Sequence, residues 1–307
     1  MARWHDPFHA IKPACVPCTP RSIALKRRMA RDYDALVLDI DGTLLDDLER
    51  LSERTRAAIA AARASGVRVM LATGRSHDGA RPWLKELALD TPCVVFNGAA
   101  VFDPVLDRLV ETIELPAPLV SDLLAFADAQ QLLPVVARAE SQYVRQPQAH
   151  ELALLRGFRN LEALPNNAVP HEHVLRVTVF SLQHAHSLAL LEDLQRAIAG
   201  RPVYCTHFPL AELAHSRDSL AQVVDVQPAC NGKALALALL ARRYGIASER
   251  VVAVGDAPND LPMLEAAGLG VAMGNAKPPV QRAAKRVIGH NDSDALALLI
   301  EELFLSS

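Results

Sequence analysis

The feature that most constrains the fold is an alternation of short apolar runs with helical patterns. Strand-like runs are expected at residues 35–40, 67–72, 93–96, 251–254 and 270–273. A helix is expected between the first two runs, with Ser52 as its N-cap and Gly66 beyond its C-terminus. A second helix is expected between Asn231, as cap, and Gly245. Strand–helix–strand alternation at this spacing favours parallel pairing through right-handed crossovers. The sequence therefore predicts an α/β fold built on an open parallel sheet.

The middle of the chain has a different pattern, which predicts a separate α+β module inserted into the α/β domain. Helices are expected at residues 118–130 and 184–199, and strands at 133–137, 142–145, 203–208, 210–214 and 221–226. The short link between the first two of these strands favours an antiparallel hairpin. We place the α/β domain at residues 33–103 and 223–307, and the inserted module at 104–222.

The first 32 residues differ from both domains and are expected to form a basic, disordered extension. They contain four prolines, two cysteines and the basic run Lys26-Arg27-Arg28. Cys15 and Cys18 have the spacing of half a zinc site, but no second pair lies nearby. Met29 opens a compact natural start, so the residues before it are expected to be dispensable.

Composition limits the function classes. The chain has 307 residues, is 50% hydrophobic and carries a net charge of −3 with a pI near 6.4. That balance gives no strong field towards nucleic acid or a membrane surface, so neither is expected as a partner. The five cysteines are odd in number and scattered, which favours a reducing compartment and hence the cytoplasm.

Four polar motifs follow predicted strands or begin a predicted helix. They are the motif 39–43 (Asp-Ile-Asp-Gly-Thr), the motif 73–75 (Thr-Gly-Arg), Lys233 near the start of the second helix, and the motif 255–260 (Gly-Asp-Ala-Pro-Asn-Asp). Ligands of open α/β sheets bind beyond the carboxyl ends of the strands. We therefore expect the four motifs to meet at one site.

The residue types in these motifs point to phosphate chemistry. Carboxylates that converge without a cation repel one another, and Mg²⁺ is the usual hard cation where phosphate is also bound. Lys233, Thr73 and the Gly74 amide supply donors for phosphoryl oxygens. Asp39 can attack phosphorus to form an aspartyl-phosphate, and Asp41, two residues further, can act as general acid and then base.

Taken in order, the segments DIDGTLL, ATGR, Lys233 and GDAPNDLPML resemble the four signature motifs of the haloacid dehalogenase-like (HAD) hydrolases. FNGAA (residues 96–100) and GLGVAMGNA (residues 268–276) are similar to the Cof-type phosphatases, and the resemblance covers about residues 33–307. It implies a Rossmann-like core and an α+β cap inserted between the second and third motifs.

The resemblance also implies a role for each motif residue. Asp39 would be the nucleophile and Asp41 the acid/base. Mg²⁺ would be held by the Asp39 carboxylate, the Asp41 backbone carbonyl and Asp256. Asp260 would be an outer carboxylate that orients either a water on the metal or Lys233. The phosphate would be held by Thr73, Gly74, Lys233, Asn259 and the Ile40 backbone.

The third motif departs from the family pattern, in which glycine usually follows the lysine. Here Gly232 precedes Lys233 and Ala234 follows it, although Pro228 lies five residues ahead of the lysine as expected. A P-loop is excluded because Ala234 stands where Ser or Thr is required.

The sequence predicts a Mg²⁺-dependent phosphatase of a small metabolite, such as a sugar phosphate or a nucleotide or cofactor phosphate. The alternatives are a phosphotransferase of the phosphomutase kind and a non-catalytic protein that binds a phosphorylated ligand. The oligomeric state cannot be read from the sequence.

Overall fold

A computed structural model of the chain describes residues 32–213 and 216–306, and these described residues form one compact unit. Of the predicted extension 1–32, all but the last residue lies outside the described residues. The expectations for Cys15, Cys18 and Met29 therefore lie outside them as well.

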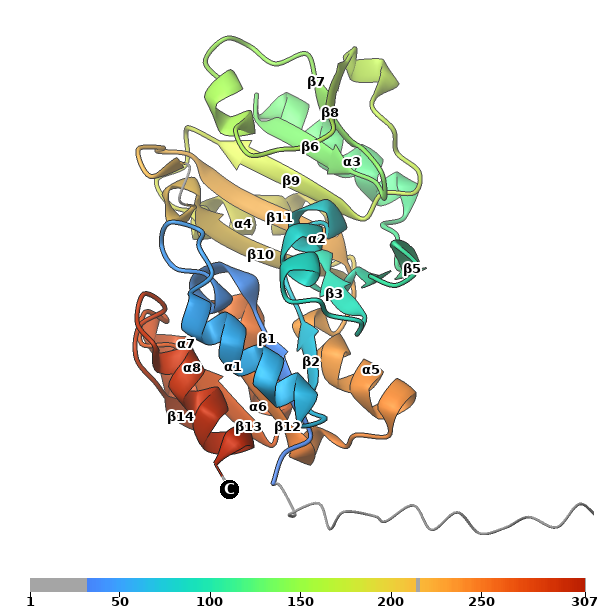
Figure 1. Cartoon of the computed structure of the whole chain (residues 1–307). Helices are drawn as coiled ribbons and strands as arrows, with labels where there is room; N and C mark the ends of the chain where they lie inside the picture. Colours follow the sequence, from blue (N-terminus) through green and yellow to red (C-terminus); the bar gives the residue numbers. More distant parts are fainter. Residues whose placement is uncertain (1–31, 214–215, 307) are drawn as a thin grey trace, which may run out of the picture. The chain divides into compact units, whose positions relative to one another are not determined.

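A five-stranded parallel sheet forms the core, in the order β14-β13-β12-β1-β2 (Figure 1). Leu38 at the end of β1 pairs with Val254 of β12 on one side and with Leu71 of β2 on the other, so the carboxyl ends of these strands meet. This confirms the predicted α/β fold class. The strands are β1 (Ala35–Leu38), β2 (Arg68–Leu71), β12 (Val251–Gly255), β13 (Leu269–Ala272) and β14 (Arg286–Val287).

Helices cover both faces of this sheet, because its strands are apolar on both sides. Leu36 and Leu38 pack with Ile59 of α1 in one cluster, whereas Val37 packs with Leu240 of α5 in another. On the first face lie α1 (Glu53–Ala64), α2 (His77–Glu86) and α8 (Ala295–Ile300). On the second lie α5 (Leu235–Tyr244), α6 (Leu261–Ala266) and α7 (Pro278–Ala283).

The N-termini of two helices can be compared with those predicted. Ser52 caps α1 as predicted, since its side chain accepts a hydrogen bond from the Thr55 amide. The helix predicted from Asn231 begins only at Leu235, and Asn231 makes no side-chain cap. The reason is Gly232, whose φ of +59° breaks the helical path and leaves a short turn before α5.

The strand expected at residues 93–96 does not join the parallel sheet as a regular member. Strand β3 (Cys93–Val95) touches it through one bridge, between Ala72 and Val94, and pairs instead with β4 in an antiparallel sheet. The chain reverses through the turn Phe96–Gly98, where all three residues have positive φ, and returns along its own path. That sheet has the order β3-β4-β5, with β4 (Ala100–Asp103) and β5 (Arg108–Thr112).

A six-stranded sheet of order β10-β11-β9-β6-β7-β8 occupies the middle of the chain, and all its pairings are antiparallel except β7 with β8. We call this sheet with its helices the cap. Its helices α3 (Ala117–Ala129) and α4 (Ser187–Ala197) pack on one face, against Val177 and Val224. The strands are β6 (Leu133–Ala137), β7 (Gln142–Arg145), β8 (Leu161–Leu164), β9 (Arg176–Ser181), β10 (Val203–Pro209) and β11 (Gln222–Pro228).

Within the cap, the predicted hairpin of residues 133–145 is present as β6 and β7. The strand expected at residues 210–214 is wrong, because the chain leaves the sheet after Pro209 and makes a single turn at Leu210–Glu212 with Leu210 buried. Strand β11 continues to Pro228 and so extends past residue 222, where we placed the boundary of the inserted module.

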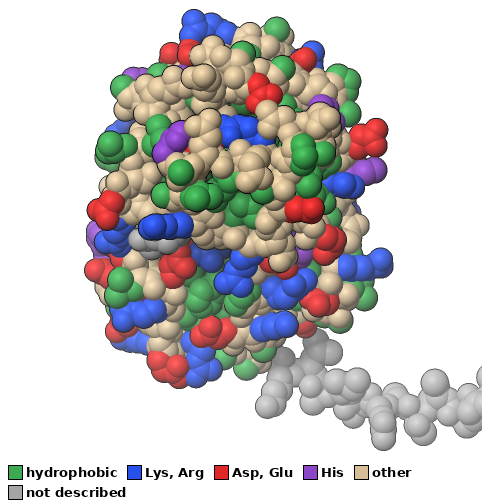
Figure 2. Space-filling view, turned by 90° about the horizontal axis from the view of Figure 1, so that it is seen from above, with side chains coloured by type: hydrophobic (Ala, Val, Ile, Leu, Met, Phe, Trp, Pro, Cys, Tyr) green, Lys and Arg blue, Asp and Glu red, His purple; other side chains and the backbone are tan. Residues whose placement is uncertain are grey.

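Among the described residues, no helix combines the length and hydropathy needed to cross a bilayer. Figure 2 shows acidic and basic side chains interspersed on the face seen from above, with hydrophobic side chains between them.

Candidate active site

The predicted site residues from the first, third and fourth motifs meet at the carboxyl ends of β1 and β12. Asp39 directly follows β1, and its amide donates a hydrogen bond of 3.1 Å to the Val254 carbonyl of β12. Lys233 reaches this point from the turn before α5. Its Nζ lies 2.5 Å from Oδ1 of Asp39 and 2.6 Å from Oδ1 of Asp260. Lys233 is only 1% exposed, so the ammonium is held between two carboxylates away from water.

Asp260 uses both carboxylate oxygens within the protein. Oδ1 accepts from Lys233, and Oδ2 accepts the backbone amides of Asp256 and Ala257, each at 2.9 Å. Gly255 is required here, because a Cβ at that position would lie 2.4 Å from the Asp260 carboxyl carbon. Asp260 therefore shapes the loop that carries Asp256 and fixes Lys233, a geometry that favours the second of the two orienting roles we expected for it.

The cluster around Asp39 contains more carboxylates than cations. One oxygen each of Asp39, Asp256 and Asp260 lies within 4.8 Å of the others, with Lys233 among them. Burial raises the pKa of Asp39 well above its usual range, opposed by Lys233 and reinforced by Asp260 and Asp256. Burial and the charge of Asp260 raise the pKa of Asp256 to about 7. Because a carboxylate-rich, oxygen-only donor set is what Mg²⁺ prefers, these residues fit that ion.

Burial by itself lowers the pKa of the Lys233 ammonium, but the charges of Asp260 and Asp39 overcome this effect and raise the pKa above its usual value. Lys233 is therefore a permanent cation at this position.

Gly42, Thr43 and Asn275 surround the Asp256 carboxylate. Thr43 Oγ1 donates to Oδ1 of Asp256 at 3.3 Å, and Asn275 Nδ2 donates to the Gly42 carbonyl at 2.8 Å. Gly42 has a φ of +69°, and a Cβ there would lie 2.4 Å from Oδ2 of Asp256. The loop can thus approach Asp256 only with glycine at this position. Asn275 is a residue that our site prediction missed, although it lies in the segment GLGVAMGNA.

The Asp41 side chain pairs with Arg75. Arg75 Nε lies 2.8 Å from Oδ2 of Asp41, and its Nη2 lies 2.5 Å from Oδ1, which makes a bidentate pair. Burial opposes the charge of Arg75, but the hydrogen bonds to Asp41 raise the pKa of its guanidinium. The Asp41 side chain is 47% exposed, unlike the 5% of Asp39. Arg75 therefore orients the carboxylate of Asp41 in this structure.

Three of the predicted phosphate-binding residues, Thr73, Gly74 and Asn259, lie around Asn97. The Asn97 amide donates to the Thr73 carbonyl, and its Oδ1 accepts from Asn259 Nδ2 at 3.0 Å. A Cβ on Gly74 would lie 3.0 Å from the same Oδ1. Ile40, the remaining predicted residue, follows Asp39 directly in the loop after β1. Asn97 thereby joins the second motif to the fourth.

Two side chains of the cap reach the motif loops, and no sequence motif predicted either contact. Arg176 of β9 donates from Nη1 to the Gly74 carbonyl at 3.0 Å. The hydroxyl of Tyr204 on β10 would lie 3.1 Å from a Cβ at Gly232, next to Lys233. Burial raises the pKa of Tyr204 to about 12, so its hydroxyl stays protonated. Both contacts join residues far apart in the sequence, which explains why local patterns could not predict them.

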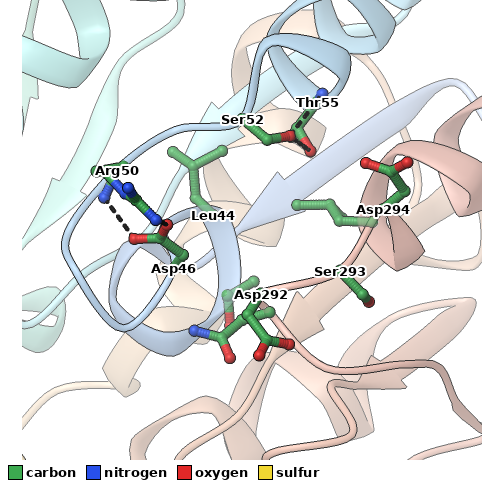
Figure 3. A pocket seen from close by; sticks show the side chains of 11 residues that line it. Leu44, Asp46, Arg50, Ser52, Thr55, Asp292, Ser293 and Asp294 are labelled. Carbon is green, nitrogen blue, oxygen red and sulfur yellow. Dashed lines mark hydrogen bonds and ion pairs between the residues drawn. The ribbon is translucent and has the colours of Figure 1, made fainter.

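A small cavity of about 70 Å³ lies beside Thr43, between the loop after β1 and residues 291–296. Figure 3 shows its wall, where Arg50 pairs with Asp46 and Ser52 meets Thr55. None of the predicted site residues lines this cavity. Thr43 joins it to the cluster around Asp39, because its hydroxyl donates to Asp256.

Comparison with known proteins identifies the class to which this fold and site belong. The family model described as haloacid dehalogenase-like hydrolase matches residues 36–300. The pyridoxal phosphate phosphatase YbhA of Escherichia coli is 30% identical over 277 residues, which cover 86% of this chain and 96% of that protein. The 5-amino-6-(5-phospho-D-ribitylamino)uracil phosphatase YitU of Bacillus subtilis is 29% identical over 276 residues, covering 88% and 97%.

A solved structure of a haloacid dehalogenase-like hydrolase from Bacteroides thetaiotaomicron aligns with a TM-score of 0.71 at 26% identity, over 89% of this chain and all of that one. The chain therefore belongs to the haloacid dehalogenase-like hydrolase family. Within the family it is a phosphatase of the Cof type, as the sequence motifs predicted.

Proposed function

We propose that this phosphatase is a Mg²⁺-dependent phosphomonoester hydrolase that acts on a small phosphorylated metabolite through an aspartyl-phosphate on Asp39. The observation that carries the proposal is the buried Asp39 carboxylate, with Lys233 Nζ at 2.5 Å and Asp256 nearby. The relatives named for pyridoxal phosphate and for a phosphoribitylamino-uracil support a small metabolite as the substrate.

Asp39 would make the new bond to phosphorus. Lys233 binds Oδ1 of Asp39, so we assign the attack to Oδ2. The fixed ammonium of Lys233 would also face the phosphoryl oxygens, where preorganised charge stabilises the transition state most effectively. Thr73, the Gly74 and Ile40 backbone and Asn259 would bind the remaining oxygens.

Asp41 would donate a proton to the leaving oxygen as the P–O bond breaks. It would then accept a proton from the water that hydrolyses the aspartyl-phosphate and regenerates Asp39. Its partly exposed carboxylate, held by Arg75 on one side, supports a role in exchanging protons with water and substrate.

The carboxylates of Asp39 and Asp256, with the backbone carbonyl of Asp41, would hold Mg²⁺. When bound, the ion supplies positive charge that offsets the negative charge of the transferring phosphoryl group. The excess of buried carboxylate over ammonium in the cluster supports this assignment.

We further propose that the inserted module 104–222, with β11 continuing to Pro228, covers the site and selects the leaving group. The contacts of Arg176 with Gly74 and of Tyr204 with Gly232 support this role, because both come from the cap sheet.

The substitution Asp39→Asn tests the proposal, since an amide is no nucleophile towards phosphorus. Phosphate release should fall by at least about 1000-fold, because the covalent route is lost. The melting temperature should stay near the wild-type value. The matched control is Asp47→Asn, an exposed aspartate of the same loop, which should keep full activity.

Metal dependence is tested in the same assay. Removing divalent ions with EDTA should abolish wild-type turnover, and Mg²⁺ should restore it. An Asp39→Asn enzyme with near-wild-type kcat would refute the role of Asp39 as nucleophile. An enzyme that stays active without metal would refute the requirement for Mg²⁺. Adding sugar acceptors and measuring transfer separates hydrolysis from a phosphotransferase reaction.

A further inference from the structure

One face of the cap sheet lies opposite helices α3 and α4. Its side chains change from polar at one end to apolar at the other. On β11, Val224 and Val226 pack against those helices, so Val223, Asp225 and Gln227 point the other way. Two cross-strand rows on this opposite face are fixed by the register. One contains Thr206, Asp225, Thr178 and Val135, and the next contains Phe208, Val223, Phe180 and Leu133.

Gln227 lies at the polar end of this face, directly across from Tyr204. Directly paired residues project on the same side of a sheet. The Tyr204 hydroxyl lies against Gly232, which precedes Lys233, so Gln227 faces the same loop.

The other neighbour of Gln227 on this face also leads to the phosphatase site. Asp225 lies two residues before it on β11 and is 3.6 Å from Arg176 Nη1, which in turn hydrogen-bonds to the Gly74 carbonyl. Gln227 is therefore flanked by contacts to the motif 73–75 on one side and to the Lys233 turn on the other.

Gln227 has no hydrogen-bond partner for its side chain in the described part of the chain. It is 0% exposed, and both its Nε2 and its Oε1 lack a partner. A buried carboxamide without partners is unfavourable, and such groups in native proteins call for an explanation. An apolar residue would fill the position without this penalty.

We propose that Gln227 binds the leaving group of the substrate, and that this group carries a hydrogen-bond donor and an acceptor side by side. The inference rests on the proposed phosphatase function and deepens it. Hydroxyls of a sugar or polyol meet this description, and so does the edge of a nitrogen heterocycle. An aryl group without polar substituents does not, because it leaves the carboxamide unpaired.

The test is Gln227→Met, which keeps the length of the side chain and removes both hydrogen-bonding atoms. Three esters separate the possibilities: glucose 6-phosphate, pyridoxal 5′-phosphate and phenyl phosphate. We expect kcat/KM to fall about 10- to 100-fold for a polar ester, because the variant leaves the polar group of the ester without its hydrogen-bond partner. With phenyl phosphate it should stay unchanged. A loss confined to the sugar ester assigns a polyol, and a loss confined to the pyridine ester assigns a heterocycle.

The matched control is Gln222→Met, the same change on the same strand at its other end. Gln222 also has a buried, unpaired Oε1, but it pairs with Ser181 and Pro209, away from Gly232. Its substitution should leave all three kcat/KM values unchanged. Gln227→Met should match or exceed the wild-type melting temperature, because it removes a polar group that the free enzyme leaves unpaired.

Several outcomes would overturn the inference. One is an equal loss of kcat/KM on all three esters together with a lower melting temperature, which would make Gln227 a structural residue. Another is no loss on any ester, and a third is a wild type that prefers phenyl phosphate to both polar esters. A wild type that releases phosphate neither from these three esters nor from a wider panel of small phosphomonoesters defeats the proposed function first, and the inference with it, before any variant is compared.

Discussion

Asn97 has a strained backbone conformation and also accepts hydrogen bonds from two residues far from it in the sequence. It is 2% exposed and has φ +50° and ψ +36°, in the left-handed region that side-chain-bearing residues seldom adopt. Asn97 accepts from Asn259 through its side chain and from the Cys230 thiol through its carbonyl. Since strained backbone persists where the surroundings fix it and clusters at functional sites, we infer that Asn97 positions Asn259.

The substitution Asn97→Ala should lower kcat/KM about tenfold or more, because it leaves the Asn259 amide without its acceptor. It should also lower stability, since alanine tolerates positive φ less well than asparagine. Asn97→Gly should lose the same activity but less stability, because glycine accepts the backbone conformation. Steady-state kinetics and thermal melts measure the two effects separately.

Asn160 provides the control for this comparison. It has nearly the same φ, +52°, and its Nδ2 contacts Asp78 on the surface. Asn160→Ala should therefore lower the stability and leave kcat/KM unchanged. If Asn97→Ala left kcat/KM unchanged while melting earlier, the positioning role would be excluded.

At the scale of elements, the features predicted correctly from the sequence are those set by residues close together in the chain. Ser52 caps α1 because its hydroxyl accepts a neighbouring amide, and Gly245 ends α5 because its φ of +66° suits glycine. The site residues after β1, β2 and β12 were predictable because parallel strands bring their carboxyl ends together.

What the sequence left open depends on contacts between distant segments. The pairing of β3 follows from the turn at Phe96–Gly98 rather than from the apolar run before it. Arg176 and Tyr204 reach the motif loops only because β9 and β10 lie in one sheet facing them. No local period carries that information, so tertiary packing decided these features.

The loop that follows β7 is tied to the strand by the ion pair of Arg145 with Glu151. The two guanidinium nitrogens lie 2.8 and 2.5 Å from the carboxylate oxygens, which also accept the Gln148 amide. The side chains are 12% and 5% exposed. Burial acts to raise the pKa of Glu151, but the hydrogen bonds from Arg145 outweigh it and lower the pKa below its usual value.

Glu151→Gln should therefore destabilise the cap by about 1–3 kcal/mol at neutral pH, because it weakens a buried charged hydrogen bond. A carboxylate with a lowered folded-state pKa stabilises the protein above the unfolded pKa of about 4.3, and this contribution is lost as pH falls through the folded-state pKa. Urea denaturation at pH 7 and pH 3.5 should thus show a difference from wild type that is large at the higher pH and shrinks at the lower. Glu162→Gln, on the exposed side of β8, should show no difference at either pH. A pH-independent difference would contradict an ionic origin.

At the scale of the whole molecule, the burial of β1 contributes a large part of the stability. Its four residues are 0% exposed and lie between β12 and β2, inside the parallel sheet. Burying each of the side chains of Leu36, Val37 and Leu38 is worth about 1.5–3 kcal/mol. Together they approach the roughly 5–15 kcal/mol by which a domain is stable. Just before β1, the Asp34 amide donates a hydrogen bond of 2.8 Å to the Arg250 carbonyl.

Deleting residues 1–28 should therefore leave kcat/KM and the melting temperature unchanged, because β1, its neighbours and all the motif residues are retained. The family match begins at residue 36, so residues 1–28 lie outside it. Deletion through Leu38 is the contrasting variant: it removes β1, a fully buried interior strand, and it should give no soluble folded protein. Circular dichroism, thermal melts and phosphate release distinguish the two truncations. Loss of soluble protein on removing residues 1–28 alone would mean that the segment packs on the α/β domain, and a fall in kcat/KM at unchanged melting temperature would instead give it a part in catalysis.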